Sequence, residues 1–449
     1  MFIASVIYAT VLLYCMAEYA SVEWYRYGHS FGGLSVLDKS MLVCALAAWS
    51  ALVPTRLNGP SSVVLVVIYL AVCIPGVVVP LGMERAAQEQ YHPLVLSLIV
   101  AFSACCIFVR LFSVSSNSSP RKCSPGLVHA MLGVWIACLA TLIFTYGSVM
   151  TLVSLDAIYD QRAAGAATNR FMGYVQTYFG YVLSPAILAF GLVRRNAILV
   201  LIGFAGGVLL YSVTAEKNAF AFPFLLVAFY YALTRRAPVF QSSAFVVVFL
   251  SLVLGIAVFL HETSFAAAFV AWYLGVRSLL TPGSFIAQYF DFFSYWGFTR
   301  LSHVTGFGWV IAPPPAPGSD DRWPSLGHLV GEQLVGIPDL NANANFVASD
   351  GIASFGVAGV FLSFMLLAAF LIALERGSAG ISRRFMALIA LPIGLILTNV
   401  SIFTVFLSFG GLFWLIVMAL FFKTEPAQVS SGGVAVGALR LSKKMTSEP

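Results

Sequence analysis

Two short polar stretches contain basic side chains whose type and spacing could form a binding site for an anion. Arg162 and Arg170 stand eight residues apart in an alanine-rich stretch that predicts one helix, so they lie within about 80° of each other at 100° per residue. Glu216 and Lys217 occupy a very short turn between two strongly apolar runs. Such cations suit an anionic ligand, because guanidinium groups bind phosphate oxygens bidentately and stay charged in a partly dry site.

Each pair also has a plainer interpretation. The two arginines would then neutralise Asp156 and Asp160 or contact lipid headgroups. Glu216 and Lys217 would form a turn that only keeps the chain solvated, although charge this close to a membrane is a functional hypothesis by default. The residue types alone leave both interpretations open.

The stretch from about Glu262 to Gly351 is long, aromatic and broken by prolines. Arg277 and Arg300 in this stretch join the candidate cations already described. Residues 285–298 contain eight aromatic side chains, which is typical of a helix in the membrane interface, and aromatic faces also stack on sugar rings. If the protein has an active site, we expect part of it here.

The same stretch contains the candidates for a base that activates an acceptor hydroxyl. His303 is the best by type, because the ordinary pKa of histidine, about 6.5, is close to working pH. Asp291 is the second candidate, and Glu332 and Asp350 follow it. A single histidine beside an interface has a structural role as its alternative.

These residues predict a site for a lipid-linked diphosphate. The cations would hold the phosphates and stabilise the charge that grows on a diphosphate leaving group, which needs no metal. The sequence has no Walker loop, no GxGxxG and no DxD pair placed for a metal-dependent sugar-nucleotide site. We therefore expect neither cofactor nor metal, with the lipid-linked donor supplying the energy.

The elements that must position these residues are membrane helices. Hydrophobic residues make up 60% of the chain and charged residues 9%, against about 25% charged in soluble domains. Runs of about 20 apolar residues predict an all-α polytopic membrane protein. We count about twelve spans, near residues 2–19, 40–54, 62–83, 93–114, 127–149, 171–193, 197–213, 219–233, 239–260, 353–374, 385–407 and 410–422.

Charge sorting predicts the orientation. With the amino terminus in the cytoplasm, the cytoplasmic loops and tail hold 15 of the 24 basic residues. The positive-inside rule then places both termini in the cytoplasm and residues 262–352 in the periplasm. Residues 1–424 form a single transmembrane domain in this interpretation, and 425–449 a disordered cytoplasmic tail. The basic residues are scattered near the membrane, so nucleic acid is not an expected partner.

Several motifs carry a resemblance. The long stretch and the helix that follows resemble the large periplasmic loop of bacterial oligosaccharide repeat-unit polymerases, the Wzy-type family of O-antigen and capsule polymerases. The number of spans and the position of the loop are similar, and Arg162 to Gly173 has the Arg-x10-Gly spacing described for that family, whereas Arg277 lacks it. The other motifs are Asn341-Ala-Asn-Ala-Asn345-Phe-Val-Ala-Ser-Asp350-Gly351, Arg277-x-x-x-x-Pro282-Gly283, Tyr289-x-Asp291-Phe-Phe293 and Gly327-His-Leu-Val-Gly331.

The resemblance implies a membrane glycosyltransferase of the GT-C type in the bacterial inner membrane. It would transfer a growing glycan from undecaprenyl diphosphate to a newly flipped undecaprenyl-diphosphate repeat unit, with membrane lipids and a chain-length regulator as further partners. Arg162, Arg170, Lys217 and Arg277 would hold diphosphates, Arg300 would assist, and His303 or Asp291 would take the acceptor proton. Other candidate site residues are Asp350, Glu216 and Tyr289.

Two other functions compete with this one. An O-antigen ligase shares the donor, the side of the membrane and the architecture, but transfers the chain to lipid A core. A transporter or flippase of lipid-linked sugars should show matching half-repeats and broken helices near the midplane. The sequence shows no convincing internal repeat, and a flippase has no need of the long loop.

Overall fold

The computed structural model is mostly helical, in agreement with a polytopic membrane protein. In the part of the chain that it describes, ten helices are long and apolar enough to cross a membrane. The predicted tail, 425–449, lies outside this part. The described residues are 1–25, 29–84, 90–113, 119–153, 157–166, 168–235, 238–311, 325–336, 341–342 and 344–424.

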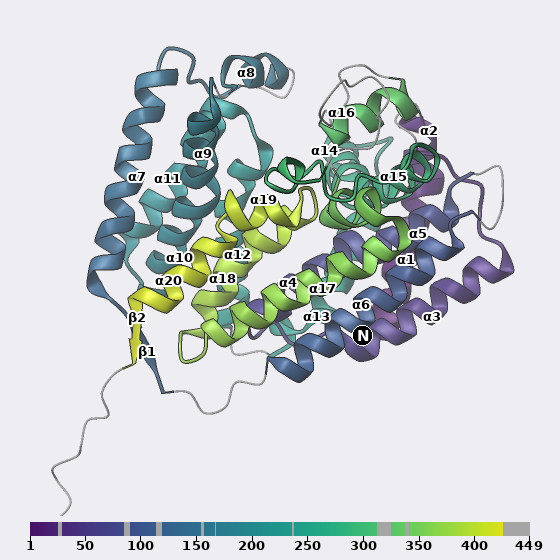
Figure 1. Ribbon diagram of the computed structural model, residues 1–449, viewed down its shortest axis with the longest axis horizontal. Helices are drawn as coiled ribbons and strands as arrows, with labels where there is room; N and C mark the ends of the chain where they lie inside the picture. Colours follow the sequence, from purple (N-terminus) through teal and green to yellow (C-terminus); the bar gives the residue numbers. More distant parts are fainter. Residues whose placement is uncertain are drawn as a thin grey trace, which may run out of the picture.

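The helices form two groups, seen side by side in Figure 1. Several long helices contain a π-helical segment, and these segments and the short 3-10 helices are labelled η. The first group consists of α1 (Phe2–Cys15) with η1 (Met16–Ala20) and α2 (Ser21–Glu23), α3 (Val36–Leu52), α4 (Pro60–Ile68) with η3 (Tyr69–Cys73) and α5 (Ile74–Gly82), α6 (His92–Phe112), α13 (Ser243–Phe259), α14 (Phe265–Val270) with η6 (Ala271–Leu280) and α15 (Thr281–Trp296), and η9 (Val347–Ile352) with α17 (Ala353–Gly377).

The second group follows the middle and the end of the chain. It consists of α7 (Pro125–Tyr146), α8 (Ile158–Ala164), α9 (Arg170–Thr177) with η4 (Tyr178–Leu183) and α10 (Ser184–Arg194), α11 (Ala197–Thr214), α12 (Lys217–Thr234), α19 (Ile402–Leu407) and α20 (Gly411–Phe421). The remaining short elements are β1 (Arg121–Cys123), η5 (Pro238–Gln241), η7 (Phe307–Trp309), α16 (Leu326–Val330), η8 (Gly331–Val335) and β2 (Phe422–Thr424). Helix α18 (Arg383–Leu397) joins the groups, because it packs on α4 and also on α10 and α12.

Both ends of the described chain lie at one face of the molecule, which we call the terminus face. Ser5 in the first turns of α1 lies 3.5 Å from Ser50 near the end of α3. At the same face β1 pairs antiparallel with β2, the last described element. Arg121 ties this pair to the end of α17 by donating to the carbonyl of Gly377. We call the opposite face, where α1 ends and α6 begins, the loop face.

The helix from Phe265 to Trp296 has the length and composition of a membrane span, yet both of its parts contact the loop face. Near its start, the carbonyl of Ala268 accepts a hydrogen bond from Tyr19 at the end of the first helix. Near its end, Asp291 accepts one from Tyr91, immediately before α6. Between these ends, Gly283 lies against the backbone carbonyl of Pro75 inside the helix formed by α4 and α5, so the middle of the helix dips into the bundle and the chain returns to the loop face.

The helix lengths refine the predicted spans. Nine of the ten long apolar helices coincide with predicted spans, and the tenth is the re-entrant helix 265–296. The other three predicted spans correspond to the shorter helices α3, α13 and α18. The span predicted at 385–407 is too long: α18 ends at Leu397, and Ser401 caps the separate helix α19 by accepting a hydrogen bond from the amide of Phe403.

The prediction that one helix carries both Arg162 and Arg170 is wrong. Helix α8 ends at Ala164, and Arg170 begins α9, capped by the side chain of Asn169. Gly165 lies so close to the end of α11 that a Cβ atom there would be 1.8 Å from the carbonyl oxygen of Val213. This backbone contact ends α8, and the 80° relation between the two arginines no longer applies.

Helix α17 is broken close to the loop face. Phe355 and Gly356 have non-helical backbone angles, and Gly356 has a φ of +61°. A side chain there would be strained and would also meet the ring of Phe298, 2.6 Å from the added Cβ atom. The carbonyls of Ala353 and Ser354 accept hydrogen bonds from the loop that follows α15.

Candidate functional site

Lys217 lies where the two groups of helices meet at the loop face. It is the first residue of α12, directly after Ala215, whose left-handed backbone (φ 49°) ends α11, and Glu216. Its Nζ atom lies 4.2 Å from the centroid of the Trp272 ring and 5.7 Å from that of Tyr273, both in η6. Two aromatic faces thus hold an ammonium group at a helix amino terminus, where the helix dipole also favours an anion.

Arg162 and Arg277 lie close to this lysine. Both guanidinium groups are within coulombic range of Lys217 and of the Tyr273 side chain. The structure therefore brings together one cation from each of the three stretches that the sequence singled out. Among the described residues, no carboxylate forms an ion pair with Lys217 or Arg277. We call Arg162, Lys217 and Arg277 the cation cluster.

Helix α8 is docked by a buried glutamine. The side-chain amide of Gln161 donates to the carbonyls of Val149, Ser212 and Val213 at distances of 2.9, 2.8 and 3.1 Å. These carbonyls lie at the end of α11 and in the segment after α7. Because Gln161 precedes Arg162, this anchor fixes the arginine beside the turn that leads to Lys217.

The docking predicts a large effect of Gly165→Ala. The new methyl group would overlap the Val213 carbonyl, so α8 must shift and carry Arg162 out of the cation cluster. We expect a destabilisation of about 1–3 kcal/mol, typical of overpacking, and loss of anion binding with every charged side chain intact. Thermal stability and binding of inorganic diphosphate to the purified protein measure the two effects. Gly133→Ala is the matched control, since nothing lies within 4 Å of the added atom; normal diphosphate binding by Gly165→Ala contradicts the prediction.

Glu216 is turned away from Lys217. Its carboxylate accepts a hydrogen bond from the hydroxyl of Tyr181 in η4, and the Tyr181 ring packs edge-on against Phe222 and Phe409. On the other side of the turn, Tyr273 donates to the side-chain oxygen of Asn218 at 3.3 Å. The acidic neighbour therefore has its own partner, and the Glu216–Lys217 pair is not a simple self-neutralising turn.

Arg170 and Arg300 do not share the contacts of the cation cluster. Arg170 is exposed at the start of α9. Arg300 is exposed in the loop after α15, with a left-handed backbone (φ 51°). A role for either in holding diphosphate stays a prediction.

Asp291 is held by two donors. Its oxygens accept hydrogen bonds from Gln90 at 2.7 Å and from the Tyr91 hydroxyl at 2.6 Å, so the carboxylate fastens α15 to the start of α6. Tyr289, two residues earlier, is buried and donates to the carbonyl of Ala342 at 3.1 Å. Both side chains have structural partners, which favours a positioning role over proton transfer.

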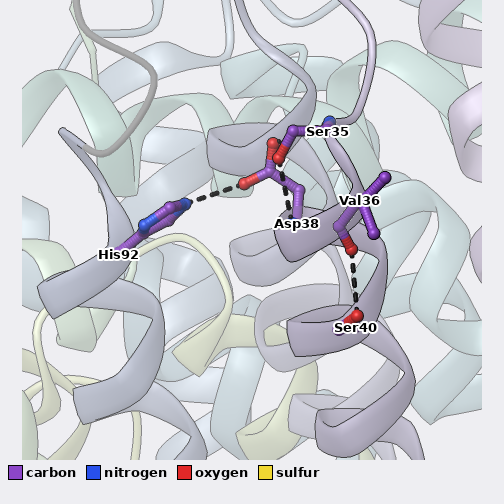
Figure 2. Close-up of polar contacts among 5 residues, drawn as sticks. All are labelled: Ser35, Val36, Asp38, Ser40 and His92. Atoms are coloured by element: carbon purple, nitrogen blue, oxygen red, sulfur yellow. Dashed lines mark hydrogen bonds and ion pairs between the residues drawn. The ribbon is translucent and has the colours of Figure 1, made fainter.

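A histidine–carboxylate contact beside Asp291 did not emerge from the sequence. His92, the first residue of α6, lies 2.8 Å from the carboxylate of Asp38, and Asp38 forms a capping box with Ser35 at the start of α3 (Figure 2). Asp38 is only 1% exposed. The sequence signal was Ser-x-x-Asp before an apolar run, which predicts a helix start but not the histidine partner.

His303 is a partly buried histidine that contacts the hydroxyl of a nearby threonine. Its Nδ1 atom lies 2.7 Å from the hydroxyl of Thr299. Burial lowers the pKa of His303 to about 4, and the nearby carbonyl of Ser349 opposes this effect. The imidazole is therefore neutral at pH 7, as a proton acceptor must be.

Asp350 is the most buried of the candidate carboxylates, with 5% of its surface exposed. One oxygen, Oδ2, accepts a hydrogen bond of 2.6 Å from the amide of Ile402 at the start of α19. The other, Oδ1, lacks a hydrogen bond of good geometry, although the hydroxyls of Ser349 and Ser401 lie close to the carboxylate. This contact joins the start of the α17 helix to the last helical hairpin.

No group of three or more metal-ligating side chains occurs among the residues that the structure describes. The charged centre of the site in this part of the chain is the cation cluster, with Glu216, Tyr181, Trp272 and Tyr273 around it. Comparisons with protein-family models, with curated proteins and with solved structures give no match to this chain.

Proposed function

We propose that the protein is a membrane glycosyltransferase of the GT-C type that polymerises undecaprenyl-diphosphate-linked oligosaccharide repeat units at the periplasmic face of the bacterial inner membrane. The observation that carries the proposal is the meeting of Arg162, Lys217 and Arg277 at the loop face. Three like charges repel one another, so their convergence beside a helix amino terminus favours a strongly anionic ligand. A diphosphate at the membrane surface has that charge.

The orientation is part of the proposal. Basic residues of the described chain gather at the terminus face. Arg121 and Lys122 lie in β1, Arg376 lies in the last turn of α17, and α18 begins with Arg383 and Arg384. By the positive-inside rule this face is cytoplasmic. The cation cluster then faces the periplasm, where flipped lipid-linked units are found.

The reaction has a simple balance. A hydroxyl oxygen of the acceptor sugar forms a bond to the anomeric carbon of the donor glycan, while the bond from that carbon to the lipid diphosphate breaks. The electron pair leaves with the diphosphate, where the cation cluster stabilises the new charge. The acceptor proton passes to a base, for which the neutral imidazole of His303 is our candidate.

Purified protein in lipid vesicles tests this function. Supplied with undecaprenyl-diphosphate repeat units alone, it should convert them into a ladder of longer chains with release of undecaprenyl diphosphate. A product that appears only when lipid A core is added would instead identify a ligase. Repeat units that cross the vesicle membrane unchanged would identify a transporter.

Transport is the second candidate, and one observation favours it. Transporters place their ligands at broken membrane helices, and α17 is broken at Phe355 and Gly356. The break lies near the loop-face end of the helix, however, and not at its middle. The carbonyls at the break, those of Ala353 and Ser354, already accept hydrogen bonds from the amides of Thr299 and Arg300. We therefore place polymerisation first.

The pKa of His303 gives the proposal a pH signature. A base with a pKa of about 4 stays unprotonated, and therefore active, at all higher pH values and loses activity as the pH falls through 4. We expect the initial rate of ladder formation to stay level from about pH 8 to pH 5 and to fall below that. An exposed histidine would give a fall centred near pH 6.5. A profile of that second kind contradicts the assignment of His303.

A further inference from the structure

Three buried polar atoms without partners occur around the start of α17. They are Oδ1 of Asp350, the hydroxyl of Ser354 and Nε2 of His303. Ser354 is fully buried and Asp350 is 5% exposed. Buried polar atoms normally have a hydrogen-bond partner, because an unpaired atom loses its hydrogen bonds to water and gains none in the protein. Three in one neighbourhood therefore point to a place built for a polar ligand.

Short contacts place these residues in the same neighbourhood. The amides of Thr299 and Arg300 donate to the carbonyls of Ala353 and Ser354 at 2.8 and 3.1 Å, so the loop after α15 is paired with the break in α17. In that loop Thr299 binds the other nitrogen of His303. Between His303 and Asp350 lies Ser349, whose carbonyl faces the imidazole and whose hydroxyl lies beside the carboxylate.

The backbone of the loop that follows α15 is strained. Arg300 and Leu301 both have left-handed angles, with φ values of 51° and 67°, although neither is glycine. Consecutive residues of this kind persist only where the surrounding structure holds them, and they gather at ligand sites.

The chemistry of the three atoms selects the ligand. A carboxylate oxygen accepts a hydrogen bond, a serine hydroxyl donates or accepts, and a neutral imidazole nitrogen accepts or donates according to its tautomer. A hydroxyl group satisfies such a set, whereas the carboxylate repels a phosphate. Aromatic rings suited to stacking on sugars stand on the same segment: Tyr295 is 80% exposed and Trp309 is 81% exposed.

We propose that Asp350, Ser354 and His303 form a subsite that binds one hydroxyl group of the acceptor glycan, next to exposed aromatic side chains of residues 295–309. The inference rests on the proposed function, since it names where the acceptor sits. It separates the site into two parts: the cation cluster binds the charged lipid diphosphate, and this subsite binds an uncharged sugar. Asp350 and Ser354 bind the acceptor hydroxyl directly and take no part in the proton transfer.

Two variants test the subsite, with undecaprenyl-diphosphate repeat units from cells that lack this protein as the probe. Ser354→Ala removes a hydroxyl that has no partner, so folding is unaffected, and Asp350→Asn keeps an acceptor for the amide of Ile402. Each should raise the apparent KM for the repeat unit by roughly 3–10-fold with kcat within about twofold, as expected for one lost hydrogen bond. Ser103→Ala is the matched control, because its hydroxyl is also unpartnered but lies in α6.

Hydrogen exchange gives a readout that does not depend on turnover. Repeat units should slow amide exchange in segments 297–304 and 345–356 of the wild type, and less so in both variants. Unchanged KM values together with unchanged exchange in these segments would overturn the subsite and leave water as the only occupant. If the wild type forms no ladder but the protection appears, the polymerase proposal fails while the subsite stands. Should Asp350→Asn not fold, Ser354→Ala decides the question alone.

Discussion

Replacing Arg162 and Arg277 together by glutamine should abolish polymer formation. Both guanidinium groups lie within coulombic range of Lys217, and in the proposed reaction they stabilise the diphosphate as its glycosidic bond breaks. A hydrogen bond between charged groups contributes about 1.5–3 kcal/mol. Loss of one such contact from each arginine corresponds to roughly a 10²- to 10⁴-fold lower kcat/KM. The rate of ladder formation from purified lipid-linked repeat units measures this fall in kcat/KM. In cells that carry the double variant, single repeat units should accumulate.

The controls for this double variant come from the same protein. Arg170→Gln combined with Arg300→Gln removes two exposed loop-face cations that lie outside the cation cluster, and we expect it to lower the activity less than the Arg162, Arg277 double variant does. Lys217→Gln should act like the arginine variants. Normal chain lengths in the Arg162, Arg277 double variant would contradict the diphosphate role of the cluster.

The sequence could predict the membrane helices because burial in lipid is a local requirement. A helix such as α6 must be apolar along its whole length whatever its neighbours are. Charged residues near the membrane can also be found from the local sequence. Each of them is costly in an apolar setting unless it has a partner or a function. That argument singled out the three stretches to which Arg162, Lys217 and Arg277 belong.

Other features depend on contacts between distant residues, so no local pattern reveals them. Asp291 has the type of a base, but its donors Gln90 and Tyr91 lie 200 residues away in the chain. The end of α8 is set by the approach of the Val213 carbonyl to Gly165, a contact between separate helices. The apolar helix at 265–296 is long enough to span a membrane, and only its contacts at the loop face show that it returns.

The motif at residues 341–351, which carries part of the family resemblance, also has a structural role. Asn345 is fully buried, and its side chain forms three hydrogen bonds. The amide nitrogen donates to the carbonyl of Pro282 at the start of α15, at 3.1 Å. The oxygen accepts from the amides of Val347 and Ala348 in η9, at 3.1 and 3.2 Å. This one residue thus fastens the re-entrant helix to the helix that carries Asp350.

Asn345→Ala should accordingly destabilise the protein more than other single loop-face changes. The substitution leaves a carbonyl and two amides buried without partners, and each unsatisfied group costs about 1–3 kcal/mol, so we expect a loss of about 3–5 kcal/mol after relaxation. Thermal unfolding in detergent measures it. Asn341→Ala in the same motif is the matched control, because Asn341 is exposed. Equal melting temperatures for the two variants would show that Asn345 is not an anchor. A much lower melting temperature for Asn345→Ala alone means that this residue of the motif positions the site without touching the ligand.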